Sequence, residues 1–183
     1  MAVAALLVVG VGLSSVLLSR TFAYDVTLVL FAVLFAVSFF AHEFAHKIVA
    51  QRSGFWAEFR LTLIGALVTL VSVFSPFKLI APGAVMVSGS ADRRTIGRIS
   101  IAGPLTNICL SFLFLQFALL FPDVAGLLFL VAAFNAWIAF FNLIPYGVFD
   151  GLKIFSWDKR IWACAFFVSL GLTVFLYWFI FLG

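Results

Sequence analysis

Long runs of apolar residues, separated by short polar or charged stretches, fill most of the chain. A helix needs about 20 predominantly apolar residues to cross a bilayer. Five runs reach this length if the second continues through His42: Met1–Ser19, Val26–Ala50, Ile99–Phe121, Val124–Phe149 and Ile161–Gly183. No basic segment precedes the first run, so we interpret it as a span and not as a cleaved signal peptide. The pattern predicts an all-α polytopic membrane protein.

A further apolar run, Leu61–Phe77, lies at the lower length limit for a span and is flanked by Arg60 and Lys78. If it crosses fully, the basic clusters before and after it lie on opposite faces of the membrane. If it enters and returns, they share one face with the later basic loops, as the positive-inside rule favours. We therefore expect five spans and a re-entrant element, with Leu79–Ser88 as a strand within it. The N-terminus and the basic face are then cytoplasmic, in the cell membrane.

Composition supports a lipid environment for nearly the whole chain. It is 66% hydrophobic and 10% charged, with a mean hydropathy of +1.27, whereas soluble domains carry about 25% charged residues. We expect one membrane domain over residues 1–183, with a core at about 26–155 and a C-terminal transmembrane helix at 161–183. The net charge of +4 reports topology and not nucleic-acid binding. Cys109 and Cys164 lie in apolar runs and indicate no disulfide framework; no oligomeric state is predicted.

The second predicted helix carries the sequence His42-Glu43-Phe44-Ala45-His46, an H-E-x-x-H motif. Residues at positions i and i+4 lie on one face of a helix, so both imidazoles can bind one zinc ion while Glu43 activates water. Ionisable groups within a membrane are costly and usually functional. The alternative is a polar helix end near the headgroups, with Lys47 extending into them. The only two histidines of the chain are in this motif.

A catalytic zinc site needs a third protein ligand, and the remaining candidates are acidic. Asp25 and Asp123 fall on the opposite face of the membrane in this topology, whereas Asp92 and Glu58 lie near arginines. Asp150 follows a span that ends on the correct face. Its alternative role is that of an N-cap for the next helix.

The depth of Asp150 requires a break in the preceding helix. His42 lies about 12 Å of helix rise from the end of its span, whereas Asp150 lies beyond the end of its own. Pro145 and Gly147 break the helix, and we hypothesise that the turn they form carries Asp150 back toward His42 and His46.

Three motifs together resemble the site-2 proteases, a family of intramembrane zinc metalloproteases. The first is His42-Glu43-x-x-His46 in a membrane helix. The second is Ala102-Gly103-Pro104-Leu105-Thr106-Asn107, which is similar to the A-G-P motif of the family. The third runs from Asn142-Leu143-Ile144-Pro145 to Asp150-Gly151, similar to the N-x-x-P stretch that ends in D-G. The likeness covers about residues 26–155, in a short form without an inserted domain. Gly147-Val148-Phe149 departs from the second Pro of many members.

The resemblance implies Zn²⁺ on His42, His46 and Asp150, with Glu43 as the catalytic base. It also implies that the substrates are transmembrane segments of other proteins, cut near the cytosolic side. By motif, Asn107 and Asn142 are candidate oxyanion donors, and helix–helix hydrogen bonding is their alternative role. The strand around Val85 is a candidate clamp for an extended substrate, or a plug between helices.

Three competing functions are weighed against a protease. A metal transporter requires polar groups along the whole path, yet the far halves of the spans are almost purely apolar. An inactive homologue that only binds transmembrane segments is disfavoured by the intact Glu43 and ligand set. A rhomboid-type serine protease requires a G-x-S motif and a separate histidine, and Ser88-Gly89-Ser90 in a basic loop matches poorly.

Overall fold

The computed structural model describes residues 26–61, 63, 83–88 and 91–182. In order, these form α2 (Val26–Arg52), β1 (Trp56–Leu61), β2 (Gly83–Ser88), α4 (Arg93–Leu120), the 3₁₀ helix η1 (Pro122–Val124), α5 (Ala125–Asn142), α6 (Asp150–Trp157) and α7 (Lys159–Leu182). The predicted helical membrane fold with a β-containing element is confirmed for the described part of the chain.

Within the described residues, four helices are long and apolar enough to cross a membrane: α2 from Val33, α4, α5 together with η1, and α7. They correspond to four of the five predicted spans. The fifth, Met1–Ser19, lies outside the described residues, as does nearly all of Leu61–Phe77. One predicted boundary is corrected. The span expected over Val124–Phe149 ends as a helix at Asn142, because the turn around Pro145 begins there.

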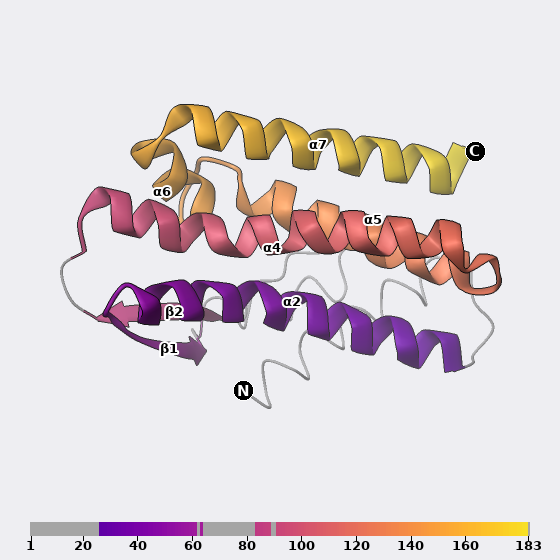
Figure 1. The fold of residues 1–183 in the computed structure, drawn as a ribbon, viewed down its shortest axis with the longest axis horizontal. Coiled ribbons are helices and arrows are strands. Elements are labelled where there is room, and N and C mark those ends of the chain that lie inside the picture. Colours follow the sequence, from indigo (N-terminus) through magenta and orange to yellow (C-terminus); the bar gives the residue numbers. More distant parts are fainter. Residues whose placement is uncertain (1–25, 62, 64–82, 89–90, 183) are drawn as a thin grey trace.

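The long helices lie side by side, with α4 in the middle of the bundle (Figure 1). α4 packs against α2, α5 and α6, and α7 packs against α5. Between α2 and α5 the rings of Phe35 and Phe134 stack with centroids 3.5 Å apart. α4 begins at a cap in which the Asp92 carboxylate accepts a hydrogen bond from the Thr95 N–H at 2.9 Å. This packing brings α2 and α4, the helices that carry the first two motifs, into contact.

β1 and β2 form an antiparallel pair at the end of the bundle where α2 ends and α4 begins (Figure 1). The register places Val85 opposite Phe59, and Gly83 opposite Leu61. The strand expected over Leu79–Ser88 is thus present from Gly83 onward. Its partner, β1, was not predicted.

Candidate metal centre

α2 places both histidines of the H-E-x-x-H motif on the face that contacts α4. Their rings are 4.8 Å apart between centroids, as expected for side chains one helical turn apart. The residues are 2% and 7% exposed, for His42 and His46 respectively. Glu43 follows His42 directly in α2 and is partly buried.

A tight turn between α5 and α6 carries Asp150 to the same point. α5 ends at Asn142, Gly147 adopts a positive φ of 59°, and α6 begins at Asp150. Gly151 packs so closely on the carbonyl groups of Leu143 and Ile144 that an added Cβ would overlap them. Phe149, and not Asp150, is the N-cap of α6. The alternative role of Asp150 as an N-cap is therefore excluded, and its carboxylate is directed to the histidines.

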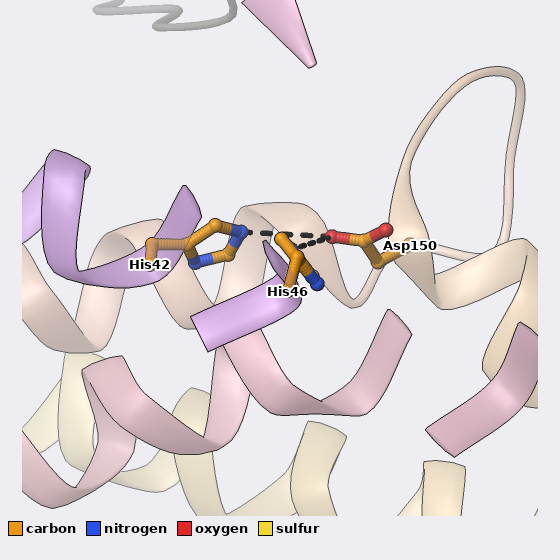
Figure 2. A group of neighbouring side chains, drawn as sticks. All are labelled: His42, His46 and Asp150. Carbon is orange, nitrogen blue, oxygen red and sulfur yellow. Dashed lines mark ion pairs between the residues drawn. The ribbon is translucent and has the colours of Figure 1, made fainter. Parts of the chain in front are cut away.

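One carboxylate oxygen faces both imidazoles (Figure 2). Asp150 Oδ2 lies 3.5 Å from His42 Nε2 and 3.1 Å from His46 Nε2. The three candidate ligand atoms all lie within 4.8 Å of one another. The second oxygen, Oδ1, accepts a hydrogen bond from Lys153 Nζ at 3.3 Å. The turn therefore removes the height difference that a straight helix would leave between His42 and Asp150.

The far nitrogens of both rings are already occupied. His42 Nδ1 lies 2.5 Å from Asn107 Oδ1, and His46 Nδ1 lies 2.7 Å from the Ile99 carbonyl oxygen. A carbonyl oxygen accepts a hydrogen bond, so Nδ1 is the donor in each ring. Nε2 is left for the shared position, where it can donate to Asp150 as N–H or bind a metal ion through its lone pair. Two imidazole nitrogens and one carboxylate oxygen are a donor set that zinc takes in catalytic sites. The residues therefore fit the metal that the motifs imply.

Electrostatics and close backbone packing complete the site. Burial acts to raise the pKa of the Asp150 carboxyl, but the charge of His46 and hydrogen bonds from both histidines outweigh it and hold that pKa well below its ordinary value. The carboxylate is therefore ionised, as a ligand must be. On the α4 side, Gly103 lies so close that a Cβ there would collide with Nε2 of both histidines. Only glycine allows α4 to approach this closely.

The other predicted site residues are Asn107, Asn142 and Val85. Both hydrogens of the Asn107 amide are donated within the bundle, to Ser38 O and Asn135 Oδ1. No donor is left for an oxyanion, and the helix–helix role fits this residue. Asn142 is partly exposed and donates to the carbonyl of Ile138 in its own helix at 3.0 Å. Val85 lies in β2, a strand that contributes none of the three ligand candidates.

Sequence reasoning did not assign the residues that support the ligands. The Ile99 carbonyl has no sequence signal, because every residue supplies one. Asn107 and Asn135 are polar residues inside predicted spans, which is a signal of interhelical hydrogen bonding, but the histidine contact of Asn107 depends on how α2 and α4 pack. Lys153, three residues after Asp150, was counted only as a basic residue of the cytoplasmic face.

Comparison with known proteins finds a relative in an archaeon. A protein of Methanocaldococcus jannaschii that carries the name "putative zinc metalloprotease" is 34% identical to this chain over 135 residues, which cover 70% of each chain. No protein-family model matches the chain. No solved structure matches it either.

Proposed function

The chain belongs to the zinc metalloprotease family of its archaeal relative, in agreement with its resemblance to the site-2 proteases, and on this premise we propose that it is an intramembrane zinc protease. Its substrates in this proposal are transmembrane segments of other membrane proteins, which it cuts within or near the bilayer. The convergence of His42, His46 and Asp150 inside a bundle of apolar helices carries the proposal.

His42, His46 and Asp150 would hold the zinc ion, and Glu43 would perform the proton transfers. When bound, zinc lowers the pKa of a water molecule to about 7 and polarises the scissile carbonyl. Glu43 is only partly buried beside the histidine pair. In our proposal it accepts a proton from the attacking water and returns it to the leaving amine.

Asn142 is the candidate donor to the developing oxyanion. An asparagine amide offers two N–H groups, and the hydrogen bond to the Ile138 carbonyl uses one of them. The residue ends α5 immediately before the turn that leads to Asp150. In our proposal the second N–H group donates to the developing oxyanion.

Replacement of Glu43 by glutamine tests the proposed function. Glu43→Gln keeps the size of the side chain and all three ligand candidates but removes the base. We expect the purified variant to retain about one zinc ion per chain by elemental analysis and to lose cleavage of a membrane-protein reporter. Asn142→Ala, assayed in parallel, should lower the rate by about 10²- to 10³-fold if Asn142 supplies an oxyanion donor. Wild-type cleavage by Glu43→Gln would refute the mechanism.

We further propose that the β1–β2 pair holds the substrate in an extended form. A helical segment must unwind before its peptide bonds are reached, and an extended chain can pair with a strand edge. Within the described residues the sheet has only two strands. In an antiparallel pair, consecutive residues direct their N–H groups alternately toward and away from the partner strand. Val85→Pro and Met86→Pro therefore remove donors on opposite sides of β2.

The variant that removes the N–H group directed away from β1 should weaken cleavage while zinc content stays at the wild-type value. The variant that removes the N–H group directed toward β1 should loosen the β1–β2 pair instead, which limited proteolysis would detect. Equal cleavage by the wild type and both variants would argue against the clamp.

The proposed location is the cell membrane, with the active-site end of the bundle in the cytoplasm. α2 ends at Arg52, α4 begins at Arg93, α6 contains Lys153 and α7 begins at Lys159. The end of α2, the starts of α4 and α7, and the short helix α6, which begins at Asp150, lie at one end of the bundle (Figure 1), and basic residues gathered at one end are the cytoplasmic pattern. A reporter fused after Gly183 should be detected on the outer side, and its detection in the cytoplasm would reverse the orientation.

A further inference from the structure

A cluster of three buried polar side chains lies behind His42, within the membrane-spanning part of the bundle. It consists of Ser38 from α2, Asn107 from α4 and Asn135 from α5, which are 1%, 0% and 0% exposed. Polar groups this deep in a membrane protein need partners, because lipid offers none. Every polar atom of the cluster has one, so its hydrogen bonds can be followed from end to end.

The direction of each hydrogen bond is set by backbone carbonyl groups, which can only accept. Ser38 Oγ donates to the Leu34 carbonyl at 2.8 Å, so this oxygen accepts from its other partner, Asn135 Nδ2, at 2.9 Å. Asn135 Nδ2 also donates to the Val131 carbonyl at 2.9 Å. The nitrogen end of the Asn135 amide is therefore fixed, and its Oδ1 must face Asn107.

The same reasoning fixes the Asn107 amide. Its Nδ2 donates to Asn135 Oδ1 at 2.8 Å and to the Ser38 carbonyl oxygen at 3.3 Å, and both of these atoms are acceptors. Asn107 Oδ1 is thus turned to His42 Nδ1, 2.5 Å away. A reversed amide would place its oxygen against two other acceptor oxygens and lose both donor contacts. On the Asn107 side of the ring, the network therefore favours the neutral tautomer of His42 with hydrogen on Nδ1.

We propose that Asn107 is a positioning residue that selects the Nδ1–H tautomer of His42 and so presents the Nε2 lone pair to the metal. The inference rests on the proposed function only in naming zinc as the ion. His46 needs no such residue, because the Ile99 backbone carbonyl holds its Nδ1. The two histidines of α2 are therefore oriented by different groups. A side-chain substitution can remove only the group that orients His42.

Asn107→Leu would remove the acceptor and leave Nδ1 of His42 facing an apolar side chain. The Nδ1–H group of His42 would then lose its hydrogen-bond acceptor, and the orientation of the ring would be less restricted. Loss of such outer-shell partners lowers metal affinity by about 10- to 100-fold in zinc proteins. Asn107→Asp keeps an oxygen toward His42 and should retain the tautomer.

Nitrogen NMR of the metal-free protein, labelled at histidine, tests the tautomer directly. The chain has two histidines, so two imidazoles give all the signals, each assigned by replacing the other residue. The Asp150→Ala background removes the carboxylate that faces Nε2 of both rings, and in it we expect both neutral histidines as Nδ1–H. When Asn107→Leu is added, the His42 signals should shift toward the Nε2–H form, while His46 stays unchanged and reports an intact fold.

Zinc affinity, measured by competition with a chromophoric chelator, is the second readout. We expect a decrease of about 10- to 100-fold for Asn107→Leu and a smaller one for Asn107→Asp. Ser111→Ala is the matched control, because Ser111 lies one turn further along α4 and its buried hydroxyl has no hydrogen-bond partner among the described residues. Its zinc affinity and His42 tautomer should equal those of the wild type.

An Nε2–H tautomer of His42 in the Asp150→Ala protein would overturn the proposal without any change at Asn107, so a folding failure of Asn107→Leu leaves it testable. Wild-type zinc affinity in a folded Asn107→Leu protein would also overturn it. Neither readout requires proteolysis. If Glu43→Gln still cleaves its substrate, the proposed function fails while the tautomer result stands, so the two failures are distinguishable.

Discussion

The indole nitrogen of Trp162 donates a hydrogen bond of 2.7 Å to the backbone carbonyl of Leu143. Leu143 is fully buried and follows the last residue of α5, where carbonyl groups have no partner within the helix. Trp162 lies in the first turn of α7. The bond therefore joins α7 to the start of the turn that carries Asp150 to the histidines.

Trp162→Phe should destabilise the protein. The phenyl ring keeps the packing against Phe155 and Phe166 but leaves the Leu143 carbonyl without a donor. A buried unsatisfied carbonyl costs about 1–3 kcal/mol, so we expect the free energy of unfolding in detergent to fall by that amount. Trp178→Phe, on the exposed side of α7, is the control. Equal stability of both variants would show that the hydrogen bond contributes nothing.

Gly103→Ala should disrupt the candidate metal centre. The added Cβ would collide with Nε2 of His42 and His46, so the rings or α4 must move. We expect zinc affinity to fall at least about 10-fold, as for other changes that misplace zinc ligands. Gly171→Ala serves as control, because a Cβ there meets nothing within 4 Å. Full zinc binding by Gly103→Ala would contradict the close approach of α4.

Gly147→Ala tests the backbone of the turn alone. A Cβ at this position meets nothing within 4 Å, but φ is +59°, a conformation that costs a residue with a side chain about 1–2 kcal/mol. We expect a loss of stability of that size in chemical unfolding. Gly126→Ala, in the first turn of α5 and equally free of contacts, should instead be neutral or more stable by up to about 1 kcal/mol. If the free energy of unfolding changes with the same sign in both variants, the result would argue against backbone strain at Gly147.

Asp150→Asn should remove most of the zinc affinity. The amide has nearly the shape of the carboxylate but lacks the negative charge that a zinc ligand supplies. We expect a decrease larger than the roughly 100-fold that loss of an outer-shell partner causes. Asp158→Asn is the control for a general effect of the substitution. Asp158 caps α7 by accepting from the N–H groups of Arg160 and Ile161, and asparagine caps a helix equally well. Isothermal titration of both variants gives the comparison.

The lengths of the apolar runs predicted the membrane helices because lipid leaves the backbone no other way to satisfy its hydrogen bonds. Helix ends were less predictable. Val124–Phe149 was expected as one span because it carries no charged residue, yet α5 ends at Asn142. β1 was missed although Ala57, Phe59 and Leu61 alternate with Glu58 and Arg60, because a two-stranded pair depends on a partner distant in the chain.

The sequence alone determined that His42 and His46 share one helix face, because the helical repeat places residues four apart on the same side. It also indicated Asp150 as the third member, through the helix-breaking Pro145 and Gly147. Only the tertiary structure decided that one oxygen of Asp150 meets both imidazoles, and that Asn107 and the Ile99 carbonyl hold their far nitrogens. Local spacing fixes directions around one helix, whereas contacts between helices depend on packing that brings residues distant in the chain together.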